Sequence, residues 1–300
     1  MVMAMPVAYH PRIMKITRLA SLVGLAFAAL LGLPASGFAQ SILGSAGNFS
    51  ILGGAAVSST ATIGTVISGG DVGSAASVTG FPPAVVTGGL VTTDTSVVDP
   101  ALTDLMQAAA GLSNMTSDAD ESGLNLGGLT LYPGVYSFSS VAALDGTLTL
   151  NANGQNNAVW VFQVGSTLTT TANSVVTLIN PGSNGGDDDG IYWDVGTGIT
   201  FGTDNQILGN YLAGTSITVG SNTNGSGRAL AQSAVSLDTN AINTNGGPND
   251  SSWNSGLMYN AMGNVVPIPE PLIFLWLASL GVMVAPILWW HKTRKLKIIV

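Results

Sequence analysis

Residues capable of nucleophilic or metal chemistry are scarce in this chain. Cysteine is absent, and the two histidines, His10 and His291, lie near the ends of the sequence. The region between them therefore lacks the groups that Ser-His and Cys-His nucleophile systems and the usual zinc sites require. The densest carboxylate run is Asp187-Asp188-Asp189, and its consecutive spacing differs from the alternating spacing of a Ca²⁺ loop. We interpret the run as a solvated turn, with Ca²⁺ binding as the alternative, and expect no catalytic site, metal or cofactor.

Hydroxyl side chains, in contrast, recur at a regular spacing. Segments of alternating apolar and Thr or Ser residues occupy 146–153, 166–173, 197–205, 215–224 and 233–240. Their first apolar residues follow one another in steps of 20, 31, 18 and 18: Leu148, Leu168, Ile199, Ile217 and Val235. The long step contains an insertion at 181–190. A period near twenty, built from short strands and Gly/Asn/Asp turns, is typical of a β-solenoid.

Strand alternation then predicts one outward column of hydroxyl groups, and a second column of hydroxyl groups recurs at the same spacing. Successive side chains on a strand point to opposite faces, so the residue after each inward apolar residue points outward. The first expected column comprises Ser58, Thr79, Thr149, Thr169, Thr200, Thr218 and Ser236. The second lies two residues before each inward position and comprises Ser166, Thr197, Thr215 and Ser233. Rungs stack about 4.8 Å apart, so both columns become ladders with almost no charge. The alternative is that Thr simply suits a solvated strand.

Composition and charge narrow the class of protein further. Only 8% of residues are charged and glycine contributes 39 of 300, which favours a repetitive β architecture over a helical enzyme. Residues 40–268 contain 15 acidic residues and one basic residue, Arg228, and so carry a formal charge of −14. This charge repels phosphate backbones, so we expect no nucleic-acid partner. We expect Arg228 to pair with a nearby Asp as a structural strut and not to act on a substrate.

One segment departs from the strand pattern. Leu102, Leu105, Met106, Ala109 and Leu112 recur at helical spacing, after an Asp99 that can cap a helix and a Pro100 that suits its first turn. We predict one helix at about 99–118, packed alongside the solenoid. The predicted fold is therefore mainly β: an irregular β-helix, or β-solenoid, at 40–247 with one long α-helix beside it.

The two ends of the chain have the character of targeting segments. Arg12, Lys15 and Arg18 precede an apolar run at 19–33, so residues 1–39 are interpreted as a secretory signal peptide. Residues 248–268 are interpreted as a linker. Residues 272–290 carry no charge and are long enough to span a bilayer, and the basic cluster at 291–297 should stay cytoplasmic.

Several motifs resemble known families. The segments LGSAGNFSILGGAAVSS, SVTGFPP, GGLTLYPGVYSFSS, LAGTSITV and GRALA, among others between 42 and 245, resemble the microbial ice-binding protein family. That resemblance implies an irregular β-helix with a long flanking helix, and binding to ice through a flat Thr/Ser-rich face. Pro269-Glu270-Pro271, with the apolar and basic segments of 269–300, is similar to the Pro-Glu-Pro sorting signal. That similarity implies processing by an exosortase-type enzyme in a Gram-negative, polysaccharide-secreting bacterium.

Three hypotheses follow. The first is a secreted or cell-surface ice-binding protein with antifreeze, recrystallisation-inhibiting or ice-adhesion activity. A rigid, uncharged array of methyl and hydroxyl groups can hold ordered water, which makes this activity physically reasonable. The second is a non-catalytic biofilm-matrix or cell-surface adhesin, with exopolysaccharide as a partner. The third is a polysaccharide-active enzyme. In the first two, the protein is exported, transiently anchored by its C-terminal helix, and then released or retained at the surface.

Overall fold

A computed structural model describes residues 41–61, 64–244 and 253–268. The predicted signal peptide at 1–39, the Pro269-Glu270-Pro271 motif and the apolar segment at 272–290 lie outside these residues. Within the described ranges, no helix is both long and apolar enough to cross a bilayer. The described chain is mainly parallel β-structure, as the repeat predicts.

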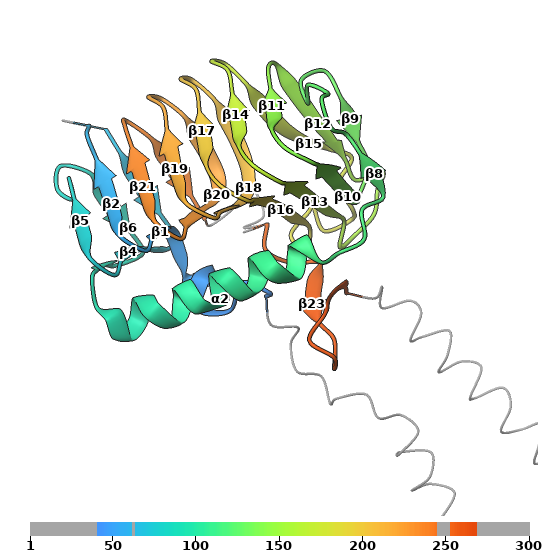
Figure 1. The fold of residues 1–300 in the computed structure, drawn as a ribbon. Helices are drawn as coiled ribbons and strands as arrows, with labels where there is room; N and C mark the ends of the chain where they lie inside the picture. The colour runs from blue at the N-terminus through green and yellow to red at the C-terminus, as the bar shows by residue number, and fades with distance from the viewer. Residues whose placement is uncertain (1–40, 62–63, 245–252, 269–300) are drawn as a thin grey trace, which may run out of the picture. The chain divides into compact units, whose positions relative to one another are not determined.

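The solenoid has three faces, of which the first is a separate sheet. This sheet has seven strands, here called the hydroxyl face, in the spatial order β11 (Ala142–Leu144), β14 (Leu168–Thr170), β17 (Ile199–Phe201), β19 (Ser216–Val219), β21 (Ala234–Leu237), β2 (Ala56–Ser59) and β5 (Ser77–Thr79). All of its pairings are parallel. In Figure 1 these strands form an uninterrupted row from β5 to β11.

A second sheet wraps around the other two faces. One of these, the helix face, contains β8 (Ala119–Asp120), β10 (Gly134–Phe138), β13 (Val159–Val164), β16 (Gly190–Val195), β1 (Phe49–Gly53), β4 (Asp71–Ser74) and β7 (Val91–Thr92). The other, the third face, contains β9 (Thr130–Leu131), β12 (Thr147–Asn151), β15 (Val175–Ile179), β22 (Ala241–Asn243), β3 (Val66–Ser68) and β6 (Val85–Thr87). Strands β18 (Gln206–Ala213) and β20 (Asn224–Ala231) run through the corner between them.

The corner between these two faces requires glycine. Gly209 and Gly227 pair with each other where β18 and β20 bend, and their φ angles are 109° and 135°. Such φ values are accessible to glycine at little cost. A Cβ on Gly227 would also lie 1.9 Å from the carbonyl oxygen of Gly209. The two glycines therefore let one strand serve two faces.

The order of the rungs in space differs from their order in the sequence. The chain first forms β1 to β7, and α2 (Thr95–Ser113) then carries it to the far end, where β8 to β10 begin the remaining rungs. These rungs proceed back until β21 meets β2, with Val235 beside Val57. At 1.5 Å per residue, the 19 residues of α2 span about 28 Å. Six strand spacings on the hydroxyl face span about the same length.

The helix begins and ends earlier than the pattern predicts. Its N-cap is Asp94, whose Oδ1 accepts a hydrogen bond from Ser96 N at 2.9 Å, and not Asp99. Pro100 lies inside the helix, where it removes one backbone hydrogen bond without ending it. At the other end, the helix stops at Ser113, and Gln163 Nε2 donates to the carbonyl oxygens of Leu112 and Met115. A pattern of apolar residues sets the period of a helix, whereas its capping partners, here the local Asp94 and the distant Gln163, decide its ends.

The helix covers one face of the solenoid. Its buried residues are Val98, Ala101, Leu105, Ala108 and Leu112. They form one apolar cluster with outward-pointing residues of the helix face, among them Phe49, Val161, Tyr192, Leu212 and Leu230. Burial of this stripe stabilises a helix that would be marginal alone in water.

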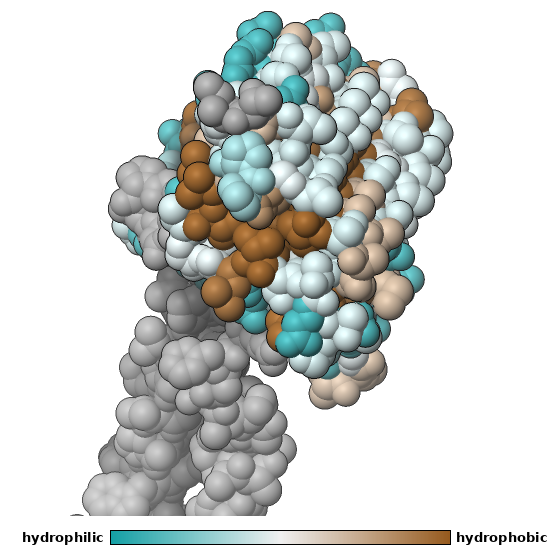
Figure 2. All heavy atoms as spheres, turned by 90° about the vertical axis from the view of Figure 1, so that its left-hand side faces the viewer, coloured by the Kyte–Doolittle hydropathy of each residue, from teal (hydrophilic) through white to brown (hydrophobic). Residues whose placement is uncertain are grey.

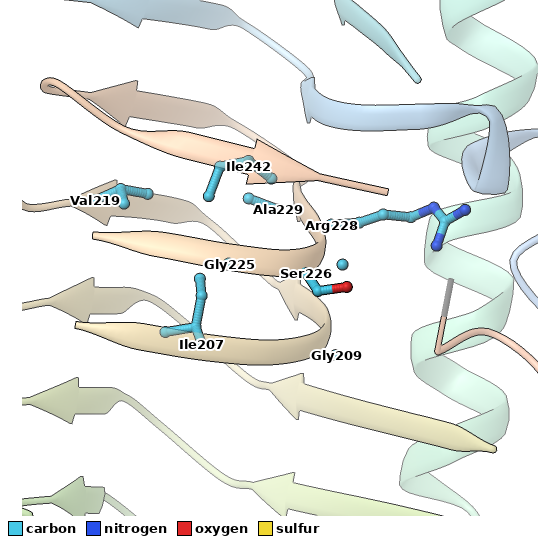
Figure 3. Close-up of a pocket in the computed structure, with 9 residues that line it drawn as sticks. Ile207, Gly209, Val219, Gly225, Ser226, Arg228, Ala229 and Ile242 are labelled. Carbon is cyan, nitrogen blue, oxygen red and sulfur yellow. The ribbon is translucent and has the colours of Figure 1, made fainter. Parts of the chain in front are cut away.

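The solenoid interior is apolar and tightly packed. Phe162, Trp193 and Tyr211 stack on successive rungs, with 3.8 Å between the first two ring centroids and 5.4 Å between the next two. Figure 3 shows Ile207, Val219 and Ile242 between the strands, whereas Arg228 points toward the segment that contains η1 (Gly44–Asn48). The cavity beside these residues measures about 10 Å³, which is about the space of one water molecule. This cavity is too small for a substrate.

Arg228 joins neighbouring elements of the fold through hydrogen bonds to a backbone carbonyl and a side-chain amide. Its Nε donates to the carbonyl oxygen of Gly47 at 3.0 Å, and its Nη1 donates to Asn210 Oδ1 at 2.9 Å. These bonds join β20 to η1 and to the neighbouring rung. Burial lowers the pKa of Arg228 to about 10, which leaves the guanidinium charged at neutral pH.

Within the segment interpreted as a linker, residues 257–267 form a hairpin. Strands β23 (Leu257–Tyr259) and β24 (Val265–Pro267) pair antiparallel, and Leu257 and Val265 are buried. Val265 packs against Gly111 of the helix, where a Cβ would lie 2.4 Å from Val265 Cγ2. The short apolar segments of the hairpin carry no repeat pattern, so nothing in the sequence indicated this packing.

The end of the solenoid at β5, β6 and β7 presents apolar side chains. Val85, Leu90 and Val91 are exposed by 49%, 70% and 46%. Figure 2, which looks at this end, shows apolar residues gathered there. The outer edges of these strands pair with nothing in the described part of the chain.

Candidate functional site

The first predicted ladder is present on the hydroxyl face. Strand register places its members side by side in the order Thr169, Thr200, Thr218, Ser236, Ser58 and Thr79. The four threonines are exposed and the two serines are half-buried. Each follows an apolar residue that points inward, which is buried in every case except the half-buried Val78 before Thr79. Six of the seven predicted positions therefore form one line across six rungs.

Thr149 does not belong to this ladder. It lies on β12 of the third face, beside Thr177 and Thr130. The position in register with Thr169 is Ala143. The step of 20 between Leu148 and Leu168 resembles the true rung spacing, but it joins strands on two different faces. Alternation shows which side chains point outward, and it does not show on which face.

The second predicted ladder is also aligned from rung to rung. Thr197 N donates to Ser166 O at 2.8 Å, Thr215 N to Thr197 O at 2.8 Å, and Ser233 N to Thr215 O at 2.7 Å. Ala55 N continues the series by donating to Ser233 O at 2.6 Å. Thr197, Thr215 and Ser233 are exposed, and Ser166 is half-buried. The Thr197 hydroxyl donates to Ser166 O at 2.9 Å, which fixes its rotamer.

A column of small residues, absent from the sequence-based expectation, lies between the two ladders. Ser216, Ala234, Ala56 and Ser77 are neighbours in register. Gly198 precedes them, and a Cβ on Gly198 would lie 3.4 Å from Ser216 O. Alternation places these residues outward, because each precedes an inward apolar residue. The sequence does not predict this column by residue type, because its members are Gly, Ser and Ala. They share only their small size.

The hydroxyl face carries no charge across its three columns, and the carboxylates begin at its margin. Asp145 follows β11 directly, and Asp238 follows β21. Asp145 Oδ1 accepts from the Thr171 hydroxyl at 2.8 Å, and Asp238 Oδ2 accepts from the Ser221 hydroxyl at 2.7 Å. These carboxylates are engaged in turns at the corner, so the face itself presents only methyl and hydroxyl groups and backbone.

Buried polar residues hold the corner behind the face. Asn205 Oδ1 accepts from Ser174 N at 2.8 Å, and its Nδ2 donates to the Thr170 hydroxyl. Two junctions further along the stack, Asn240 Nδ2 donates to Gly220 O at 2.8 Å and its Oδ1 accepts from Asp238 N at 2.6 Å. Satisfied buried networks of this kind fix one backbone arrangement. The ladders are therefore held on a rigid support.

The third face is uncovered by the helix but is less uniform. Its outermost aligned column comprises Thr147, Val175, Gln206, Asn224, Ala241, Val66 and Val85. This column mixes long amides with branched apolar side chains, so its members project to different heights. This column is less regular than the columns of the hydroxyl face.

The chemistry open to the hydroxyl face is binding. Its hydroxyl groups can donate and accept hydrogen bonds, and its methyl groups disfavour mobile water. Among the described residues, no three His, Cys, Asp or Glu side chains gather as a metal-binding group. The fold and the site together define a parallel β-solenoid with one regular, uncharged, open face.

Comparison with known proteins places this solenoid in a family. Residues 51–243 match the model of the Ice-binding-like family, and the chain belongs to that family. The chain is 47% identical over 174 residues to an ice-binding protein from Nostoc sp. (strain HG1), and the match covers 58% of this chain. The chain spans 62% of the length of that relative.

Solved structures agree with this assignment. The ice-binding protein of the Antarctic ascomycete Antarctomyces psychrotrophicus is 36% identical with a TM-score of 0.61, and the match covers 67% of this chain and 96% of that one. A domain of ice-binding protein 1 from Shewanella frigidimarina is 29% identical with a TM-score of 0.59, with coverage of 67% and 95%. The family and the β-helix fold implied by the sequence motifs are thus confirmed.

Proposed function

We propose that this protein binds ice crystals through the hydroxyl face. The observation that carries the proposal is the alignment of three columns of small uncharged side chains, two on one open sheet and one directly before its strands. The names of the Nostoc relative and of the two solved structures support the same activity.

The regularity of the face is what suits it to a crystal. Outward side chains repeat about every 4.8 Å across the strands and about every 7 Å along them. This grid presents hydroxyl groups to water at fixed positions, and its methyl groups leave little room for mobile hydration. Charged side chains would order water around themselves in a geometry unrelated to a lattice. The rigid support also limits the side-chain and backbone entropy that is lost on binding.

Antifreeze activity, inhibition of recrystallisation and ice adhesion would all arise from this contact. They differ in what the adsorbed protein does to the crystal or to the cell that carries it. Thermal hysteresis and recrystallisation assays on residues 40–268 test the proposal. Ice shaping and hysteresis are the expected results, whereas a preparation that is folded but inert in both assays would contradict the proposal.

We further propose that the chain is exported and sorted at the cell surface of a Gram-negative bacterium. The support is sequence alone: the basic and apolar segments of 1–39, Pro269-Glu270-Pro271, the uncharged segment 272–290 and the basic cluster after it. An exosortase-type enzyme is the proposed processing partner. Fractionation of expressing cells, with and without a Glu270→Ala substitution, tests this route, since only the intact motif should yield the processed form.

A second candidate function is a non-catalytic matrix or adhesin role, with exopolysaccharide as the partner. The observation that favours it is the apolar end of the solenoid at Val85, Leu90 and Val91, with strand edges that pair with nothing in the described residues. Exposed edges of this kind tend to associate with other chains. Sedimentation with the exopolysaccharide of the producing cells, in the absence of ice activity, would favour this role.

A further inference from the structure

Two adjacent carboxylates, the half-buried Asp188 and the buried Asp189, lie outside the hydroxyl face, in the insertion between β15 and β16. Asp189 is completely buried, although the run of three acids has the sequence character of a solvated turn. One carboxylate oxygen of Asp188 and one of Asp189 are buried without a hydrogen-bond partner. Leaving a charged oxygen buried without a partner is costly, so this pair calls for a bound proton or cation.

The two carboxylate oxygens of Asp189 differ in their hydrogen bonding. Oδ1 accepts a hydrogen bond from Ala158 N at 2.9 Å. Oδ2 faces Gly186, where a Cβ would lie 3.1 Å away from it. Gly186 has a φ of 93°, and its carbonyl oxygen accepts from Asp189 N at 3.1 Å. The backbone at Gly186 therefore lies close to Oδ2, the oxygen that has no hydrogen-bond partner. Glycine at this position lets the backbone approach it.

Further oxygen atoms belong to the same loop. Asn184 Oδ1 accepts from Gly186 N at 3.2 Å, and the carbonyl oxygen of Gly182 accepts from Gly185 N at 3.0 Å. Carbonyl and amide oxygens that accept one hydrogen bond keep a second lone pair. The loop thus combines two carboxylates with a backbone rich in oxygen acceptors.

The electrostatics favour a cation at this place. Both carboxylates lie within residues 40–268, whose formal charge is −14. Arg228, the single basic residue of 40–268, donates hydrogen bonds to Gly47 of η1 and Asn210 of β18.

We propose that the 181–189 loop binds one calcium ion, with Asp188 and Asp189 as its carboxylate ligands. Calcium takes six to eight oxygen ligands in irregular geometry and accepts backbone carbonyls, whereas magnesium demands a near-ideal octahedron. Two carboxylates from adjacent residues, with loop carbonyls and water, match the calcium preference. The ion would fix the loop where Gly190 begins β16 and bridges to Asn254.

The test uses the full-length chain in a mild non-ionic detergent, stripped with EDTA at pH 7.5. Calorimetric titration with CaCl2 should give one binding event per chain, and the melting temperature should rise with Ca²⁺, since a ligand of the native state stabilises it. Magnesium should bind at least tenfold more weakly. Asp188→Asn and Asp189→Asn should lose most of the binding and the thermal shift. Asp187→Asn, in the same run but exposed, is the matched control and should keep both.

Two results would overturn the proposal. If Asp189 is satisfied by a proton, Asp189→Asn will melt higher than the parent, and Ca²⁺ will give neither heat nor a thermal shift. If the Asp188→Asn and Asp189→Asn variants bind Ca²⁺ as tightly as the parent, the ion binds elsewhere. Neither result depends on ice binding, because the readouts are calcium affinity and thermal stability.

Discussion

Ser58 on β2 is the in-register neighbour of Ser236 on β21. The two serines come from the first and the last rungs of the solenoid in sequence order. Their pairing joins two stacks of rungs that no short connection of the chain links. As a result, Thr169, Thr200 and Thr218 continue through Ser236 and Ser58 to Thr79 without interruption. The length of the hydroxyl face thus depends on a contact between distant parts of the sequence.

The register makes a prediction about Thr149 that differs from the sequence-based expectation. Thr149→Lys places a charge on the third face, so ice activity should stay within about twofold of the parent. Thr169→Lys places the same side chain on the hydroxyl face and should lower thermal hysteresis severalfold. Hysteresis measured at equal concentrations of the two variants checks this. An equal loss of thermal hysteresis in both variants would show that Thr149 also contacts ice.

Much of the inward and outward pattern was predictable, because it depends on local alternation. Leu168, Ile199, Ile217 and Val235 are buried as expected. The neighbours of each rung were harder to predict. Each turn of the solenoid has up to three strands with the same alternation, so Thr149 and Thr169 look equivalent in sequence although they lie on different faces. Strand pairing depends on how each complete turn of the solenoid distributes its strands over the three faces.

Interactions between distant segments account for the other differences. The end of α2 is set by Gln163 from β13, which the pattern of apolar residues in the helix cannot show. The hairpin at β23 and β24 is held by Gly111 and other distant neighbours. The burial of Asp189 likewise depends on how the insertion folds back over β15, since Gly186, Leu178 and Pro181 meet there.

The role of Gln163 leads to a prediction about stability. Gln163→Ala removes two donated hydrogen bonds, at 2.7 and 2.8 Å, and leaves the carbonyl oxygens of Leu112 and Met115 without that partner. The free energy of unfolding should fall by about 1–3 kcal/mol. Urea denaturation measures the loss, and Gln206→Ala, on an exposed residue of the third face, should stay within about 0.5 kcal/mol of the parent. Two indistinguishable variants would show that Gln163 does not cap the helix.

Asp194 should make stability depend on pH. Burial raises its pKa to about 6 from an ordinary value of 3.8, while its Oδ2 accepts a hydrogen bond from the Ser113 hydroxyl. Between these two values the unfolded chain releases a proton that the folded chain retains. The free energy of unfolding therefore falls as pH rises through about 4 to 6, and stays lower above that window.

Denaturation at pH 5 and pH 7.5, with EDTA in both buffers, measures this effect. The parent should be more stable at pH 5. Asp194→Asn keeps an oxygen that can accept from Ser113 but cannot ionise, so its difference between the two pH values should be smaller. Burial also raises the pKa of Asp189, so Asp189 contributes to the pH dependence of the parent. For that reason the comparison is between variant and parent. A variant with the full pH dependence of the parent would exclude Asp194 as its source.

The most direct test of ice binding by the hydroxyl face compares two double variants in one thermal hysteresis measurement. Thr200→Lys with Thr218→Lys introduces two charges at neighbouring positions in the centre of the ladder. Thr130→Lys with Thr147→Lys introduces the same two charges at exposed positions of the third face. With both proteins folded by circular dichroism, the first should lose hysteresis and the second should retain it. Undiminished hysteresis in the Thr200/Thr218 variant would contradict the assignment of the ice-contact surface.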